Sequence, residues 1–315
     1  MLMADSVTYS LSTMWAQQDR FADMHAFAEA AKALGYDSIE VSHSTPTEQF
    51  ERLLNGSGAT LSSIHAPAPL VWLGKKRNSS LNLAALDEER DQAVEFTIGS
   101  IDHAAKVGAG YVVVHLGGIA SNLPETRAGM LDSELKHRKL FDSGTRDGPE
   151  IDALRRETLE RRAELAPPWF ERARESLAEL AAYARERGVA IGIENRLHHH
   201  EFPLPKEALE LCADYPAELV GYWHDVGHAE VQARLGFVDK RAWLDTLKER
   251  TLGSHLHDVD GIGDHRAPGN GDVEWDYIAE GLPRSAAWVM EINQHQPDED
   301  VAGAIAFLRE RGVID

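Results

Sequence analysis

Short apolar segments alternate with longer amphipathic segments along almost the whole chain. The short segments are rich in valine, isoleucine and leucine, as in buried strands, and the longer ones repeat apolar residues at helical spacing. Strands are therefore expected near residues 6–14, 38–42, 60–65, 111–115, 189–194, 219–223, 252–256 and 287–292. Helices are expected near residues 19–34, 48–54, 87–107, 168–187, 206–212, 240–250, 275–281 and 300–311.

The order of these elements predicts the fold. Strands that alternate with helices form a parallel sheet with right-handed crossovers. Repetition over the whole chain matches a closed (β/α)8 barrel, the TIM barrel, better than an open sheet. No Gly-x-Gly-x-x-Gly motif follows the first strand, which counts further against a dinucleotide-binding fold. We therefore predict a single TIM-barrel domain that spans residues 1–315.

A long polar segment, about residues 119–168, separates the fourth strand from the next expected helix, which Pro168 would open. A structureless segment of this length is unusual in a compact domain, so we expect a helical or irregular insert. Leu154, Leu159 and Leu165 lie among many charged residues there, as in a solvated helix. The insert is either a charged surface excursion or an active-site lid or subunit contact.

Composition and charge narrow the classes of function. The chain is 43% hydrophobic and 27% charged, as in a globular protein, and no apolar segment is long enough to span a membrane. The net charge of −20 opposes binding to nucleic acid or anionic membranes. Cys212 is the only cysteine and the N-terminus lacks signal-peptide features, so a reducing, cytoplasmic location is expected.

Ionisable residues lie at the carboxyl ends of the predicted strands from the third onward, where TIM barrels place their catalytic groups. They are His65, His115, Glu194, Asp225 with His228, His255 with His257 and Asp258, and Glu291. One such histidine alone is more often a hydrogen-bonded structural residue. Random placement would not give the whole series, so the series predicts one polar site at the carboxyl end of the barrel.

Four members of the series form a metal-capable set: Glu194, Asp225, His255 and Glu291. Carboxylates with one imidazole suit Mn²⁺, Co²⁺, Mg²⁺ or Zn²⁺ and leave positions open for substrate oxygens, so one divalent ion is expected. Asp225 and His228 are three residues apart across a glycine, so one can bind the ion while the other stands beside it. The run His198-His199-His200 is either a substrate contact or a solvated loop.

Several short motifs resemble the xylose isomerase-like TIM-barrel superfamily. They are Ser-Ile-His-Ala-Pro (63–67), Val-His-Leu-Gly-Gly (114–118), Ile-Glu-Asn-Arg (193–196), His-Asp-Val-Gly-His (224–228), His-Leu-His-Asp (255–258), Pro-Gly-Asn-Gly (268–271) and Met-Glu-Ile-Asn (290–293). The resemblance covers residues from about 36 to 293, without the insert. The superfamily includes sugar and sugar-phosphate isomerases and epimerases, inosose dehydratases, 3-dehydroshikimate dehydratases and endonuclease IV.

The ketose 3-epimerase branch of the superfamily has four metal ligands, which fall by motif on Glu194, Asp225, His255 and Glu291. Its substrate-contacting histidine falls on His228, but its arginine after the strand-seven histidine is replaced by Gly261. The resemblance implies a metal-dependent isomerase or epimerase of a sugar or polyol-derived keto compound. The two glutamates would move a proton through an ene-diolate. Substrate contacts are expected from His65, His115, Arg196, His228, His257 and His265.

Three alternatives remain. A dehydratase would use the same ene-diolate to expel hydroxide. An endonuclease IV-like phosphodiesterase would hold three zinc ions with the additional histidines His65, His115, His228 and His265. That family has an aspartate two residues before its loop histidine, whereas Gly263 stands there and Asp264 adjoins His265. An inactive binding subunit would normally have lost one of the four ligands. The expected partner is a small carbohydrate, and the chain could form a homo-oligomer.

Overall fold

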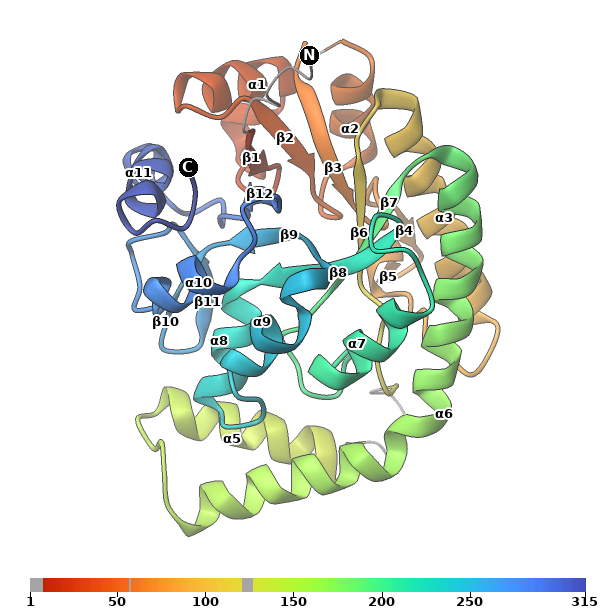
Figure 1. Cartoon of the computed structure of the whole chain (residues 1–315), viewed down its shortest axis with the longest axis vertical. Coiled ribbons are helices and arrows are strands. Elements are labelled where there is room, and N and C mark those ends of the chain that lie inside the picture. Colours follow the sequence, from red (N-terminus) through yellow and green to blue (C-terminus); the bar gives the residue numbers. More distant parts are fainter. Residues whose placement is uncertain (1–7, 57, 121–126) are drawn as a thin grey trace.

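The computed structural model describes residues 8–56, 58–120 and 127–315, and its centre is a closed barrel of parallel strands (Figure 1). Around the barrel the strands follow the order β1-β12-β9-β8-β7-β6-β3-β2. Their bounds are β1 Tyr9–Ser12, β2 Ser38–Val41, β3 Thr60–His65, β6 Tyr111–Val114, β7 Ala190–Glu194, β8 Val220–Asp225, β9 Thr251–Leu256 and β12 Ala287–Met290. The predicted TIM barrel is confirmed. Residues 6 and 7 of the first predicted strand lie outside the described residues.

Helices surround the barrel and connect its strands (Figure 1). The α-helices are α1 Met24–Ala33, α2 Thr47–Leu54, α3 Glu89–Val107, α5 Asp132–Asp142, α6 Pro149–Arg187, α7 Pro205–Ala213, α8 Val226–Arg234, α9 Arg241–Leu247, α10 Trp275–Gly281 and α11 Asp298–Glu310. Short turns of 3₁₀ helix cover Asp19–Phe21, Asn78–Ser80 and Lys248–Arg250, and a π-helical turn, η3, covers Arg127–Leu131. No helix in the described ranges is both long enough and apolar enough to cross a membrane.

The sequence did not predict α8 or two small antiparallel hairpins. Helix α8 starts directly after β8, and the side chain of Asp225 caps it by accepting a hydrogen bond from the His228 N–H at 2.7 Å. One hairpin pairs β4 (Trp72–Leu73) with β5 (Lys76–Arg77), and the other pairs β10 (Asp258–Asp260) with β11 (Gly263–Arg266). Both hairpins follow the carboxyl ends of barrel strands, and the β10–β11 hairpin contributes Asp264 and His265 to the polar site.

The insert after β6 is helical, as expected, but its boundaries differ from the prediction. Helix α6 begins at Pro149 and continues through Pro167 and Pro168, whereas the sequence placed a helix start at Pro168. Two prolines remove backbone hydrogen bonds from a helix interior. Buried side chains on both sides of them, Ile151 before and Trp169 after, pack the helix and hold it continuous. With α5, the first part of α6 forms the helical pair at the bottom of Figure 1.

The barrel interior below the polar strand ends is closed by Trp223. This side chain is fully buried and clusters with Val113 and Val289. Gly192 and Gly253 leave room for its ring, because a Cβ atom at either position would lie 2.7 or 2.3 Å from the indole. The barrel is therefore a filled core and not a channel.

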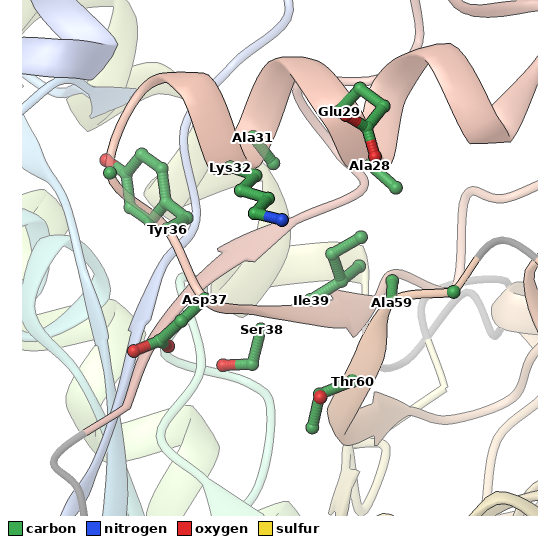
Figure 2. Close-up of a pocket in the computed structure, with 12 residues that line it drawn as sticks. Ala28, Glu29, Ala31, Lys32, Tyr36, Asp37, Ser38, Ile39, Ala59 and Thr60 are labelled. Carbon is green, nitrogen blue, oxygen red and sulfur yellow. The ribbon is translucent and has the colours of Figure 1, made fainter.

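A shallow hollow of about 360 Å³ lies at the other end of the barrel, where β2 and β3 begin (Figure 2). Its walls come from α1 and from residues 35–39 and 58–60, including Lys32 and Asp37. Since the carboxyl strand ends carry the chemistry in TIM barrels, this hollow is not the candidate active site.

Candidate active site at the carboxyl end of the barrel

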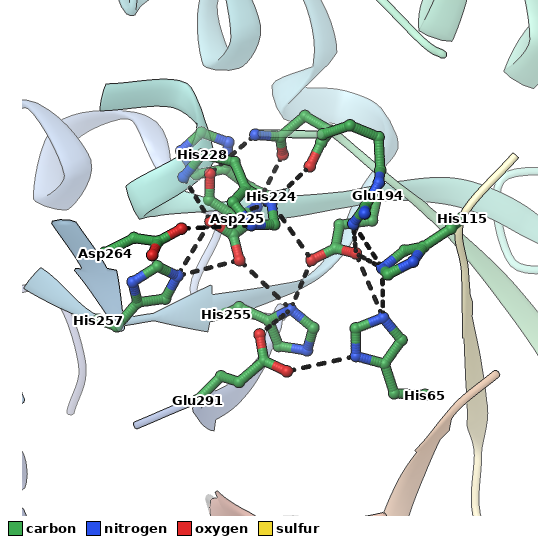
Figure 3. Close-up of polar contacts among 12 residues, drawn as sticks. His65, His115, Glu194, His224, Asp225, His228, His255, His257, Asp264 and Glu291 are labelled. Carbon is green, nitrogen blue, oxygen red and sulfur yellow. Dashed lines mark hydrogen bonds and ion pairs between the residues drawn. The ribbon is translucent and has the colours of Figure 1, made fainter. Parts of the chain in front are cut away.

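The four residues predicted to bind a metal lie together, on four strands that are neighbours in the barrel (Figure 3). His255 is at the centre, and its Nδ1 atom faces all three carboxylates. The distances from this atom are 2.8 Å to Glu194 Oε1, 3.3 Å to Glu291 Oε2 and 3.6 Å to Asp225 Oδ2. All four side chains are buried. Asp225 and His255 are direct partners in the β8–β9 register, which places them side by side.

Glu40 is a member of the site that sequence reasoning missed. It lies on β2 and accepts a hydrogen bond from His255 Nε2–H at 3.0 Å, and its second oxygen accepts one from the Ser63 hydroxyl at 2.7 Å. The bond between His255 and Glu40 fixes the imidazole ring so that Nδ1 faces the other three carboxylates. Carboxylates often orient metal-binding histidines in this way. The signal in the sequence was a charged residue between the apolar Ile39 and Val41 of a predicted strand.

His257 points to Asp225 and away from the centre of the site. Its Nε2 atom lies 3.0 Å from each oxygen of Asp225, and its Nδ1 atom accepts a hydrogen bond from the backbone N–H of His265 at 2.9 Å. Burial lowers the pKa of His257, but the facing Asp225 raises it to about 9. The Nε2–H of His257 thus donates to Asp225 and holds that carboxylate in place.

A second group forms around the other oxygen of Glu194. His115 Nε2 lies 2.5 Å from Glu194 Oε2, and His65 Nε2 lies 3.3 Å from the same atom and 2.6 Å from His115 Nε2. Arg196 Nη1 is 2.6 Å from His115 Nε2 and 3.3 Å from Glu194 Oε2. Burial and the adjacent Arg196 lower the pKa of His115 to about 3, so it stays neutral. His43, also missed, packs its ring 4.8 Å from that of His65.

A third group lies on the far side of Asp225. His228 Nδ1–H donates to the Asn195 carbonyl at 3.0 Å, which leaves Nε2 facing Asp264 Oδ2 at 3.8 Å. His265 Nε2 is also 3.8 Å from that oxygen. His265 has a φ of 57°, a left-handed conformation that is strained for a non-glycine residue. His228, Asp264 and His265 therefore lie together. The sequence position of Asp264, directly before His265, had counted against an endonuclease IV-like metal site here.

Asp258 has a structural role. Its two oxygens accept hydrogen bonds from the backbone N–H groups of Val259, Gly269 and Val273 and from the indole of Trp275. Asp258 therefore stabilises the Gly/Pro-rich loop after β9 and is not one of the residues proposed to bind the metal.

The electrostatics of the site suit a cation. Burial raises the pKa of each carboxyl in the predicted set, but surrounding histidines lower it well below its usual value, and all three stay ionised. His65 Nδ1 and Glu291 Oε1 are buried 3.4 Å apart, and neither makes a hydrogen bond within the described part of the chain. Three of the sets whose donor atoms lie within 4.8 Å of one another are Glu40 with His65, His255 and Glu291; His65 with His115 and Glu194; and His228 with Asp264 and His265. Ionised carboxylates, imidazoles and unpaired donor atoms fit a divalent ion.

Comparison with known proteins supports the predicted resemblance. Residues 158–311 match the family model described as xylose isomerase-like TIM barrel. No curated protein matches the chain in sequence. The resemblance to the xylose isomerase-like TIM-barrel superfamily is therefore confirmed by the family match over the second half of the chain.

Solved structures resemble the whole barrel. A D-tagatose 3-epimerase-like protein superposes with a TM-score of 0.64 at 18% identity, over 97% of both chains. D-psicose 3-epimerase from Clostridium cellulolyticum gives 0.64 at 16% identity, over 97% of this chain and 99% of that one. A putative xylose isomerase from Rhodospirillum rubrum gives 0.64 at 18% identity, over 98% and 99%. At these identities the likeness establishes the fold.

Proposed function

We propose that the chain is a divalent-metal-dependent isomerase or epimerase that acts on a sugar or a polyol-derived keto compound. The convergence of Glu194, Asp225 and Glu291 on one nitrogen of His255 carries this proposal. The similar structures are of proteins named as sugar epimerases and a xylose isomerase, which supports the choice of substrate class.

Glu194, Asp225, His255 and Glu291 would hold the ion. Once bound, Mn²⁺, Co²⁺, Mg²⁺ or Zn²⁺ would supply Lewis-acid polarisation of a substrate carbonyl, which makes the adjacent C–H more acidic. The protein supplies the remaining parts: an oriented imidazole, ionised carboxylates and a floor that excludes water.

The two glutamates are the proposed acid–base pair. They come from β7 and β12, the outer two of the four neighbouring strands, so they approach the centre from opposite sides. One glutamate carboxylate would take a proton from the substrate carbon and leave an ene-diolate, and the other glutamate, after taking up a proton from water, would return one to that carbon. His65 lies between them, with Nε2 3.3 Å from Glu194 Oε2 and Nδ1 3.4 Å from Glu291 Oε1. It keeps both carboxylates in position.

The remaining polar side chains are proposed substrate contacts: His65, His115, Arg196, His228, His257 and His265. They lie at or after the carboxyl ends of β3, β6, β7, β8 and β9, where hydroxyl groups of a carbohydrate would find both donors and acceptors. The same ene-diolate could lose a hydroxide, so a dehydratase is the nearest variant of this proposal.

A second candidate is a three-zinc phosphodiesterase like endonuclease IV. Two observations favour it: His65, His115 and Glu194 form one additional metal-capable group, and His228, Asp264 and His265 form another. The net charge of −20 opposes a nucleic-acid substrate.

Metal content tests the two candidates against each other. The purified chain is stripped with a chelator, reloaded and measured by elemental analysis, beside His115→Ala and His228→Ala variants. An isomerase should lose no ion in either variant, because neither residue belongs to its ligand set. Loss of one zinc in each variant, with hydrolysis of a phosphodiester substrate, would establish the second candidate.

A further inference from the structure

A fourth group of metal-capable side chains lies outside the active site, between the insert and the loop after β7. Glu134 comes from α5, and His198 and His200 come from the loop. Nothing in the proposed function uses these residues. The donor atoms of the three side chains lie within 4.8 Å of one another.

The geometry of this group leaves donor atoms unpaired. His198 Nδ1 lies 2.9 Å from Glu134 Oε1, a hydrogen-bond distance. His200 Nδ1 lies 3.6 Å from Glu134 Oε2, which is too long for a hydrogen bond. His200 Nδ1 and Glu134 Oε2 are both buried, and neither has a hydrogen-bond partner among the residues that the structure describes. Glu134 as a whole is only 1% exposed.

An ion accounts for this spacing. Around a tetrahedral Zn²⁺ with bonds of about 2.0–2.1 Å, neighbouring ligand atoms lie about 3.3–3.4 Å apart. The 3.6 Å separation of His200 Nδ1 and Glu134 Oε2 is close to that edge. Two imidazoles with one carboxylate are a frequent donor set for zinc, with one position left for water. The side chain of His198 is 36% exposed, so the site is open to solvent on that side.

The local charges are compatible with a cation. Burial raises the pKa of Glu134, but the facing imidazoles of His198 and His200 lower it, so the carboxylate is ionised. Two other charged groups nearby are Glu201, which accepts a hydrogen bond from the His198 N–H at 3.1 Å, and Arg138, whose Nη1 atom lies 3.9 Å from Glu134 Oε1. This distance is near the limit for an ion pair and leaves the carboxylate available to the imidazoles.

The backbone holds the two histidines in place. The Ile119 N–H donates to the His200 carbonyl at 3.1 Å, and Arg162 Nε–H from α6 donates to the His199 carbonyl at 2.9 Å. His199 itself is buried and turned away, with its ring 5.0 Å from that of Phe237. His199 is buried beneath the insert, whereas His198 and His200 stay partly exposed, so the run His198-His199-His200 is only in part a solvated loop.

We propose that Glu134, His198 and His200 bind a transition-metal ion, Zn²⁺ by the chemistry of the donors, that fastens the insert to the loop after β7. This loop also carries Arg196, which contacts Glu194 and His115. The ion would therefore stabilise the insert and keep Arg196 at the edge of the active site. The proposal does not depend on which reaction the active site catalyses.

Zinc binding by three variants tests the proposal. Each protein is stripped with a chelator, titrated with Zn²⁺ and desalted, and the ions per chain are measured by elemental analysis. His198→Ala and the isosteric Glu134→Gln should each retain one ion fewer than the wild type. His295→Ala, which removes an exposed histidine elsewhere, should match the wild type. The same difference of one ion should persist in an Asp225→Asn background, which separates this site from the active site.

Hydrogen exchange supplies a second readout. Zn²⁺ should slow amide exchange in α5 and in residues 196–201 of the wild type and of Asp225→Asn, and should have no such effect on Glu134→Gln. Equal ion counts in the wild type and both variants of the cluster, or equal zinc-dependent protection of α5 in Glu134→Gln, would overturn the proposal.

Discussion

Two layers of side chains inside the barrel differ completely, although they are only two residues apart on the same strands. The polar layer consists of Glu194, Asp225, His255 and Glu291, and the floor layer consists of Gly192, Trp223, Gly253 and Val289. Residues two apart on a strand face the same side, so each polar residue stands directly above a floor residue. One layer concentrates charge and the other contains none.

The contrast shows how a buried charged site is supported. The floor layer has glycines at two positions because the indole of Trp223 occupies the space that side chains there would need. The indole packs edge-on against His255, with ring centroids 5.5 Å apart. It therefore closes the site from below and keeps water away, which strengthens every electrostatic interaction in the polar layer.

The largest expected effect on stability comes from the floor layer. Trp223→Ala should lower the free energy of unfolding by about 3–5 kcal/mol, because it empties a large volume in a rigid core. Urea or thermal unfolding measures this. Trp72→Ala, at a tryptophan that is 58% exposed, is the matched control and should change stability by less than about 0.5 kcal/mol. Equal effects of the two changes would mean that Trp223 does not close the barrel.

A smaller change in free energy, seen in metal affinity, is expected at Glu40, which orients a residue of the polar layer. Glu40→Gln keeps the size of the side chain but removes the charge that fixes His255 Nε2–H. Metal affinity should fall by roughly 10–100-fold, or about 1.4–2.8 kcal/mol, with little change in unfolding. Isothermal titration of the stripped protein measures the Kd. An unchanged Kd would show that His255 needs no partner on β2.

The fold and the polar layer were accessible from sequence because both follow local rules. Apolar segments at regular intervals predict the strands, and the carboxyl ends of parallel strands must meet at one face of the barrel. Glu194 and Glu291 end or directly follow their strands, so the rule places them at the site without any knowledge of the packing.

The residues that were missed depend on contacts between distant segments. Glu40 reaches His255, which is 215 positions away, and Glu134 reaches the histidine loop from an insert whose helix has no strong apolar period. Pro167 and Pro168 indicate a helix start, but packing on both sides keeps α6 continuous. Such outcomes are decided by tertiary packing, which overrides local preference.

Proton exchange at the substrate carbon tests the central claim most directly. Metal-loaded protein is incubated with ketohexoses and ketopentoses in D₂O, and deuterium at the carbon beside the carbonyl is followed by NMR. The wild type should incorporate deuterium into at least one substrate, and Glu291→Gln should do so about 10²–10⁴-fold more slowly. Glu29→Gln, an exposed residue at the hollow in Figure 2, should match the wild type. Undiminished exchange in metal-saturated Glu291→Gln would contradict the account.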